Sequence, residues 1–394
     1  MLGGAMRENL IRPAGPGCPR SACASANAPD ALRQIKEALG PGNLAQVFLF
    51  ADALADIESL AREGQVLWPE AEVVGCTTAG EITSRGYDAG QIVAFALPAM
   101  GFSTELLVIE NLDQLDTKAL VSDLLRARQS LARRAFARAS EFAVLLVDGL
   151  SGQEDALVSA LSGGLGPVPL FGGSAGDGIR FQRAELFARG RRFSNAAVLS
   201  IVRSACDVQL FSFNHLKPTM SRMVVTRADP EARSVVRIND EPAAREYARL
   251  LGLHVEELSP TVFAANPVLV RVGGRYHARS IQQVGAGDSL VFFAAIDEGL
   301  VLTLGEPEDI SAHLARELDA LSARRQPSAV LGFDCIFRRF EAEGRQSVRA
   351  VSDTLARHGV VGFSTYGEQI GAMHVNQTMT GVAFFPPESL DAAS

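Results

Sequence analysis

The chain has 394 residues, of which 47% are hydrophobic and 21% charged, and its formal net charge is -8 at pH 7. This balance is typical of a folded protein with room for two domains, and it argues against a general nucleic-acid surface, which needs clustered Lys and Arg. No apolar run reaches the roughly 18 to 20 residues that cross a bilayer, and the N-terminus lacks the apolar segment of a secretory signal. We therefore expect a cytoplasmic protein whose five cysteines are reduced thiols.

The first half of the chain has the pattern of an α/β domain. Residues 1–30 are rich in Gly, Pro, Ala and Ser without periodicity, and we expect them to form a disordered tail. Over residues 31–213, apolar runs predict strands that alternate with amphipathic helices, and these residues form the first predicted domain. The expected strands are 46–50, 72–76, 91–97, 104–109, 142–147, 195–202 and 207–213, and the expected helices are 31–39, 54–67, 115–137 and 153–161.

The second predicted domain, residues 214–388, contains more antiparallel signals. The expected strands are 224–226, 234–238, 268–272, 277–284, 289–295, 300–304 and 328–335, with helices at 242–251 and 308–321. Short strands joined by Gly-containing turns favour antiparallel pairing, so we expect an α+β fold in this half. The predicted fold class is therefore α/β to α+β, with two domains of mixed β-sheets flanked by helices.

One short pattern occurs three times. Residues 360–368 (VVGFSTYGE) repeat residues 73–81 (VVGCTTAGE), and residues 171–177 (FGGSAGD) are a shorter version. Glycine lets other groups approach the backbone closely, while the hydroxyls and the closing acid are polar contacts. If the three loops meet at strand ends they line a polar pocket, and otherwise they are ordinary turns. The side chains expected to bind a ligand there are Thr77, Thr78, Glu81, Ser174, Asp177, Ser364, Thr365, Tyr366 and Glu368.

Enzymatic alternatives have weaker support in the sequence. Gly172 to Gly176 fits the G-x-S-x-G pattern of a serine hydrolase, with Ser174 as nucleophile and His215 downstream. The residues after Gly176 do not begin the helix that this motif requires, so a hydrolase is a minor alternative. Phosphate-binding patterns with a Walker lysine or a G-x-G-x-x-G turn are also missing. We expect a protein that is not an enzyme.

The six histidines show no paired spacing of the kind that zinc sites need. A single histidine can still ligate haem iron from one side. His215 follows an aromatic strand near the domain boundary, and His374 lies in the segment that contains the repeated loop. Each of the two imidazoles is also compatible with a purely structural role, and the sequence leaves both readings open.

In the repeated loops and in the segment that contains His374, the chain resembles the FIST family, a bacterial and archaeal sensory module with an N-terminal and a C-terminal domain. Residues 75–82 and 171–177 resemble the N-domain motifs, and residues 242–243, 288–290, 362–368 and 374–378 resemble the C-domain motifs. The resemblance extends from about residue 35 to residue 386. It implies a sensor that binds small ligands and catalyses no reaction.

Within this family the chain is similar to the NosP branch of haem-containing nitric oxide sensors, through residues 214–218 and 367–369 and through the lack of an attached output domain. This resemblance implies haem b with His215 as the proximal iron ligand and His374 as the second candidate. It also implies nitric oxide as ligand and a partner histidine kinase in two-component signalling that controls biofilms. The family as a whole implies an alternative, a haem-free sensor of amino acids or other small metabolites. Assembly into a homo-oligomer stays open.

Overall fold

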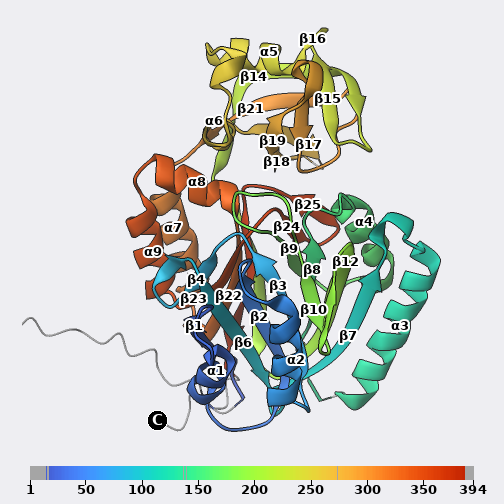
Figure 1. Cartoon of the computed structure of the whole chain (residues 1–394), viewed down its shortest axis with the longest axis vertical. Helices are drawn as coiled ribbons and strands as arrows, with labels where there is room; N and C mark the ends of the chain where they lie inside the picture. The colour runs from blue at the N-terminus through green and yellow to red at the C-terminus, as the bar shows by residue number, and fades with distance from the viewer. Residues whose placement is uncertain (1–14, 16, 136, 139, 273, 387–394) are drawn as a thin grey trace, which may run out of the picture.

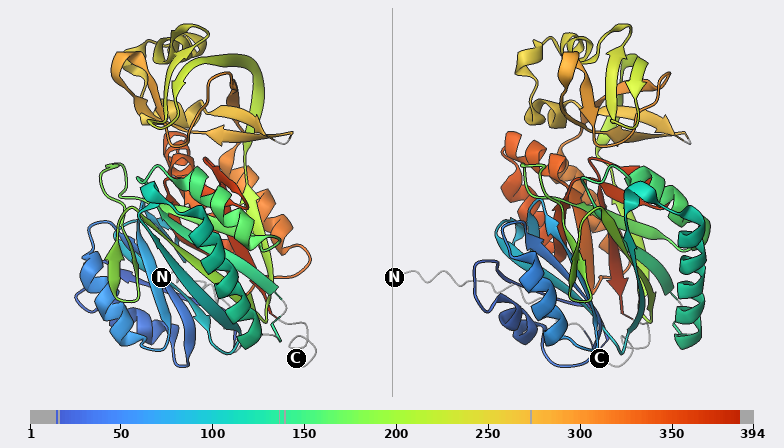
Figure 2. Two further views of the ribbon diagram at one scale, coloured as in Figure 1. Left: turned by 90° about the vertical axis from the view of Figure 1, so that its right-hand side faces the viewer. Right: turned by 45° about the vertical axis from the view of Figure 1, so that its right-hand side comes forward.

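The computed structural model describes residues 15, 17–135, 137–138, 140–272 and 274–386. They form a lower body and an upper lobe, which stand apart in all three views (Figures 1 and 2). The upper lobe consists of residues 216–307, and the lower body contains the described residues on either side of that segment. Within the described part of the chain, no helix is both long enough and apolar enough to cross a membrane.

Three similar units make up the lower body. In each unit a strand, one or two helices and a parallel second strand are followed by a third strand that returns antiparallel to the first. The first unit comprises β2 (Leu44–Asp52), α2 (Ile57–Leu67), β3 (Glu72–Thr78) and β6 (Gln91–Pro98). The second comprises β8 (Ser140–Asp148), α4 (Glu154–Leu165), β9 (Leu170–Ala175) and β12 (Ala196–Ser204). The third comprises β22 (Ala329–Cys335), α8 (Ile336–Gly344), α9 (Val348–Arg357), β23 (Val360–Thr365) and β26 (Met379–Phe385).

An antiparallel edge strand completes each unit. These strands are β1 (Arg20–Ser25) beside β6, β7 (Phe102–Glu110) beside β12, and β13 (Asp207–Phe213) beside β26. The prediction of a disordered tail is therefore wrong for residues 20–25, because backbone bonds to β6 order a segment of small residues that has little strand propensity of its own. Residues 1–14 and 16 of the predicted tail, and residues 387–388 of the second predicted domain, lie outside the described residues.

A β-hairpin or short strand pair follows the second parallel strand of each unit and joins the sheet of a different unit. The pair β4 (Glu81–Thr83) and β5 (Gly86–Asp88) extends the third sheet through β23, and β10 (Leu186–Ala188) with β11 (Arg191–Phe193) extends the first sheet through β3. The pair β24 (Glu368–Ile370) and β25 (Met373–Val375) extends the second sheet through β9. The exchange is cyclic, so no unit has a complete sheet without a neighbour.

The three sheets enclose one aromatic core, and the helices cover their outer faces. Phe50 of the first unit stacks on Phe363 of the third at a ring distance of 4.7 Å, and Phe171 of the second lies 5.3 Å from Phe333. Separate apolar clusters hold α1 (Ala31–Leu39) and α2 on the first sheet, α3 (Thr117–Arg134) and α4 on the second, and α7 (Ile310–Ser322) and α9 on the third. Burial of this shared aromatic surface stabilises the lower body as one unit.

The upper lobe is built from antiparallel strands, whereas residues 308–386 of the predicted second domain belong to the lower body and include the parallel pair β22 and β23. The strands of the upper lobe are β14 (Leu216–Asp229), β15 (Ser234–Ile238), β16 (Glu241–Pro242), β17 (Val268–Val272), β18 (Arg275–Arg279), β19 (Ile281–Val284), β20 (Leu290–Phe292) and β21 (Val301–Pro307). Helices α5 (Ala243–Leu251) and α6 (Pro260–Ala265) pack on them, and short 3-10 turns span Val255–Glu257 and Ala286–Asp288; a third 3-10 turn, Leu112–Gln114, lies in the lower body. Mixed sheets flanked by helices confirm the predicted fold class.

Candidate functional site

The three repeated loops meet at the carboxyl ends of the parallel strands. The Ala79 N–H donates to the Ser364 carbonyl at 2.9 Å, the Tyr366 N–H to the Ser174 carbonyl at 3.2 Å, and the Gly176 N–H to the Thr77 carbonyl at 3.2 Å. Each loop thus bonds to the next in the same cyclic order as the exchanged strand pairs. The repeated sequence marks the junction of the three units.

The two repeated glutamates have internal partners at this junction. Glu81 accepts hydrogen bonds from the Thr78 hydroxyl and, at 3.1 Å, from the Gln91 N–H. Glu368 accepts from the Thr365 hydroxyl and from Thr378, whose N–H and Oγ1 lie 3.2 and 2.8 Å away. Burial raises the pKa of Glu81 to about 7 and that of Glu368 to about 8. Each carboxyl closes its own strand pair, so neither side chain is open to a ligand.

The acid of the third loop occupies a different place. Tyr366 donates its hydroxyl hydrogen to Asp177 Oδ1, and the N–H groups of residues 182 and 183 donate to Oδ2 at 3.1 and 3.0 Å. In two of the exchanged strand pairs the repeated acid faces the neighbouring strand: Glu81 lies opposite Phe363, and Glu368 lies opposite Gly173. In the third strand pair the corresponding position, opposite Cys76, is occupied by Leu186. The sequence alignment of Asp177 with the two glutamates is therefore wrong, because an insertion separates this loop from its strand pair.

A cavity of about 220 Å³ opens at the ends of β2 and β3 against α8, and we call it the strand-end pocket. Its charged groups are Asp52 at the end of β2, Asp177 and Arg180 after β9, and Arg339 and Glu343 on α8. Of the predicted ligand-binding residues, only Thr78 and Asp177 line it. The full lining is Asp52, Ala53, Thr78, Ala79, Gly80, Ala89, Asp177, Gly178, Ile179, Arg180, Ile336, Arg339, Phe340 and Glu343.

Local contacts fix the charges of the strand-end pocket. Asp52 Oδ1 accepts the Leu54 N–H at 2.8 Å, which leaves the other carboxylate oxygen without a protein donor among the described residues. Arg339 donates from Nη1 to the Asp88 carbonyl at 3.0 Å and from Nε to Glu343 at 3.3 Å. Sequence analysis missed Asp52 and Arg339. An acid ends the first strand of the first and second units, at positions 52 and 148, and this repeat could have located Asp52.

His215 does not fit the role of a haem ligand. Its Nδ1 lies 2.8 Å from Arg338 Nη1, and its Nε2 lies 2.6 Å from Glu341 Oε2. A guanidinium group only donates, so Nδ1 accepts and the ring proton lies on Nε2, which donates to Glu341. Burial lowers the pKa of His215, in agreement with a neutral ring. Both nitrogens are engaged in the interior, at the point where the chain passes from β13 to β14.

His374 is equally buried, with 1% of its surface exposed. Its Nδ1 lies 3.2 Å from Gln369 Nε2, and its Nε2 has no partner among the described residues. Neither the strand-end pocket nor the hollow on the upper lobe is lined by either of these histidines. The free nitrogen is a candidate contact for a small molecule, but the packing around it leaves no described space for a macrocycle.

Ser174 lacks the surroundings of a nucleophile. Its hydroxyl accepts a hydrogen bond from Gln369 Nε2 at 3.0 Å and is fully buried. The chain after Gly176 continues as a loop to β10, so the strand-to-helix turn of a serine hydrolase is not formed. Within the described residues, no cluster of three or more His, Cys, Asp or Glu side chains is suited to hold a metal ion.

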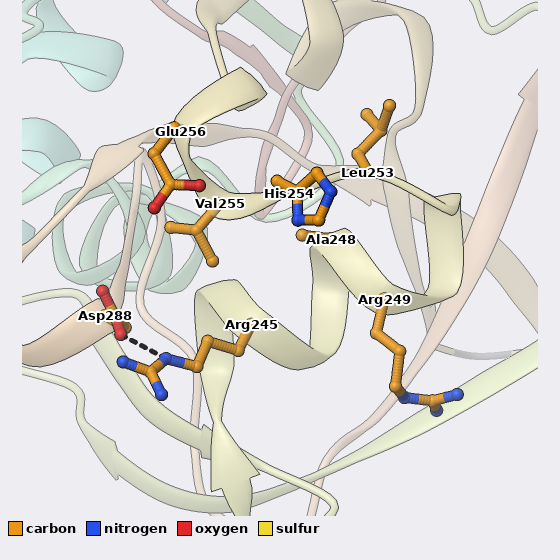
Figure 3. Close-up of a pocket in the computed structure, with 8 residues that line it drawn as sticks. All are labelled: Arg245, Ala248, Arg249, Leu253, His254, Val255, Glu256 and Asp288. Carbon is orange, nitrogen blue, oxygen red and sulfur yellow. Dashed lines mark hydrogen bonds and ion pairs between the residues drawn. The ribbon is translucent and has the colours of Figure 1, made fainter.

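A more open hollow of about 390 Å³ lies on the outer side of the upper lobe, beside α5 (Figure 3). Arg245 points toward Asp288 and pairs with it at 2.6 Å, whereas Arg249 extends away from both and pairs with Glu246. These cations already have acidic partners at the surface. The hollow is therefore a weaker candidate for a ligand site than the strand-end pocket.

Family models match most of the chain. The FIST N domain model matches residues 43–241, and the FIST C domain model matches residues 243–371. No curated protein matches the chain. The division between the two family models falls inside the upper lobe, which the chain enters at Leu216 and leaves at Pro307.

Proposed function

The chain belongs to the FIST family, whose domains are small-ligand sensors in signal transduction, and we propose that it senses a small zwitterionic metabolite bound in the strand-end pocket. The observation that carries the proposal is a cavity at the carboxyl ends of parallel strands with both carboxylates (Asp52, Asp177 and Glu343) and guanidinium groups (Arg180 and Arg339) on its walls. A water molecule takes about 30 Å³, so the pocket holds about seven non-hydrogen atoms. A small free amino acid is of this size.

The charges suit the two ends of an amino acid. The oxygen of Asp52 that lacks a protein donor accepts from the ammonium group, and Arg180 and Arg339 bind the carboxylate. A ligand of a single sign would leave one side of the pocket unpaired. This chemistry favours a zwitterion over a purely anionic or cationic metabolite.

Helix α8 connects the pocket to the junction with the upper lobe. Arg339 lines the pocket, while Arg338 and Glu341 of the same helix hold His215 between the two lobes. A ligand that binds Arg339 shifts helix α8 and with it the side chains that hold His215. If the ligand binds more tightly to one arrangement of the two lobes than to another, it shifts the equilibrium between those arrangements. We propose a partner histidine kinase, as the family resemblance implies, as the receiver of that change.

The test is a thermal-shift screen of the full chain against free amino acids and related small metabolites. A hit stabilises the protein by about 2.7 kcal/mol at a concentration of 100 Kd. Asp52→Asn keeps the shape of the side chain and its bond to Leu54 but removes the charge, so it should abolish the response. Arg245→Met, in the hollow on the upper lobe, should leave the response unchanged.

The haem-based alternative, a nitric oxide sensor with haem b on His215, makes the opposite prediction. Haemin added to the purified chain would give a Soret band that shifts with nitric oxide. The band would be lost in His215→Ala and kept in His277→Ala. That result, together with no stabilisation by any amino acid, would overturn the proposal.

A further inference from the structure

Two of the five cysteines lie side by side at the edge of the aromatic core. Cys18 precedes β1, and Cys206 lies in the turn that joins β12 to β13. Their thiols are hydrogen-bonded to one another, and Cys206 Sγ also lies 4.0 Å from the Gly17 carbonyl oxygen. Both side chains belong to the apolar core that the three sheets enclose. Two reduced thiols in direct contact are placed to form a disulfide.

Close backbone packing holds the two thiols together. The Ala205 N–H donates to the Gly101 carbonyl at 2.9 Å, and the Cys206 N–H donates to the Ser204 hydroxyl at 3.0 Å. Gly101 also packs against the segment before β1, because a Cβ atom on Gly101 would lie 2.1 Å from the Gly17 carbonyl oxygen. Glycine at position 101 therefore lets the turn between β6 and β7 contact both cysteine-bearing segments at once.

The surroundings of Cys18 favour its thiolate form. The hydrogen bond from Cys206 lowers the pKa of the Cys18 thiol to about 6, although burial opposes this change. Ser328 and Arg325 lower the pKa of Cys18 further. Arg325 Nη1 bonds to Asp207 at 3.2 Å, while Nε and Nη2 are buried without a partner among the described residues. The thiolate is the nucleophilic form of cysteine, so Cys18 is the reactive member of the pair.

The second thiol keeps its proton. The hydrogen bond to Cys18 raises the pKa of Cys206, so Cys206 is the donor of the pair. Among the described residues, none of the other three cysteines has a thiol neighbour. Burial raises the pKa of Cys76 and that of Cys335, whereas Cys23 is exposed on β1 and serves as an internal reference for reactivity.

We infer that Cys18 and Cys206 are a redox modification site, where hydrogen peroxide converts the two thiols into a disulfide. The Cys18 thiolate attacks one peroxide oxygen, the O–O bond breaks, and Cys18 becomes a sulfenic acid while hydroxide leaves. The Cys206 sulfur then attacks the Cys18 sulfur, the S–O bond breaks, and the leaving hydroxide takes the Cys206 proton as water. The two sulfurs lose two electrons, and the peroxide is reduced to water and hydroxide.

The disulfide connects two sheets and reaches toward the lobe junction. It ties the segment before β1, the edge strand of the first sheet, to the start of β13, the edge strand of the third sheet. The other end of β13 leads to His215, which the side chains of α8 hold at the entry to the upper lobe. Oxidation therefore restrains the strand that enters the junction, and the cross-link should raise the Tm of the chain.

The test is oxidation of the reduced full chain with hydrogen peroxide at pH 7, a reagent small enough for thiols of residues that are 2% exposed. Free thiols are then alkylated in denaturant, and the chain is digested with trypsin. Trypsin places the five cysteines in five separate peptides, residues 8–20, 21–33, 63–85, 204–222 and 326–338. Peptides 8–20 and 204–222 should appear joined and lighter by two hydrogen atoms, while peptide 21–33 carries an alkylated thiol. Dithiothreitol should separate the joined peptides and reverse the rise in Tm.

Three variants assign the roles within the pair. Cys206→Ser should stop at the sulfenic acid of Cys18, which dimedone labels in peptide 8–20. Cys18→Ser should lose both the cross-link and the dimedone label. Cys23→Ser, the matched control on β1, should form the cross-link as fast as the wild-type chain. If the buried variants do not fold, the peptide map of the wild-type chain decides the question.

Two outcomes would overturn the inference. In the first, peroxide oxidises Cys23 while peptides 8–20 and 204–222 keep free thiols. In the second, the cross-link forms as fast in concentrated urea as in the native chain, which means that the folded geometry contributes nothing. Neither cysteine lines the strand-end pocket, so the inference does not rest on the proposed function, and a failed ligand screen would leave it standing.

Discussion

Glu368 is the buried carboxyl whose charge state should have the largest effect on stability. Replacing it with Gln keeps the shape of the side chain, an acceptor for the Thr378 N–H and a donor for the Thr365 hydroxyl. Burial raises the pKa of Glu368 from its ordinary value of 4.5 to about 8. The folded chain therefore binds a proton that the unfolded chain has already released across this pH range. The stability that this proton contributes is complete below about pH 4.5 and is lost as the pH rises through about 8.

The magnitude follows from the displacement of the pKa. Each pH unit between the two pKa values corresponds to about 1.4 kcal/mol, so full ionisation of Glu368 costs on the order of 5 kcal/mol. We expect Glu368→Gln to match the wild-type chain near pH 5 and to exceed it by several kcal/mol at pH 9. One kcal/mol moves the Tm of a domain of 150–250 residues by about 2 to 4 °C, so the difference is measurable.

Differential scanning fluorimetry at pH 5, 7 and 9 tests this expectation. Glu37→Gln on α1 is the matched control, because Glu37 is exposed and has no ion-pair partner among the described residues. Its Tm should follow that of the wild-type chain at every pH. Parallel Tm curves for Glu368→Gln and the wild-type chain would show that the carboxyl is ionised at little cost, and the reasoning from its burial would fail.

Three further predictions concern packing, thiols and charge. Gly362→Ala should prevent folding, because a Cβ there overlaps the Gly332 carbonyl, whereas Gly359→Ala, in open space at a φ of 63°, should cost only about 1–2 kcal/mol in a urea melt. In the native chain a thiol reagent should rapidly label only the exposed Cys23, and it should label the other four cysteines only after denaturation. Rapid labelling that persists in Cys23→Ser would contradict the structure. Arg338→Met should cost about 3–5 kcal/mol by leaving the Asp334 carboxylate buried without its partner, and adding Asp334→Asn should recover part of that loss in the same melt.

The sequence contained enough information to find the three loops but not their connections. The loops share residues at fixed offsets, and a local repeat can be recognised without knowledge of the fold. Which sheet each following strand pair joins depends on contacts between residues far apart in the chain, and no local pattern encodes them. The insertion before Leu186 hid the true third member of the set, so Asp177 was aligned in its place.

Burial of charge explains the main helix that sequence analysis missed. Helix α8 places Arg338 and Glu341 in the interior, where they bond to Asp334 and His215. Charged residues on the buried face interrupt the apolar stripe by which amphipathic helices are recognised. The next helix, α9, does carry Val348, Val351 and Leu355 at helical spacing, and that signal could have located it. Side chains that join the lobes thus obscured the helix that carries them.

The arrangement of contacts determines which part of this molecule is able to move. Each unit of the lower body donates a strand pair to a neighbouring sheet, so displacing one unit would break backbone ladders in the other two. The upper lobe is joined by two chain crossings, by an apolar cluster that includes Phe293 and Tyr366, and by polar contacts such as the hydrogen bond from Arg279 to the His374 carbonyl. Separating the lobes breaks few backbone hydrogen bonds and leaves every sheet intact. The boundary between the lobes is therefore the part of the molecule where a small difference in binding energy suffices to shift an equilibrium between two arrangements.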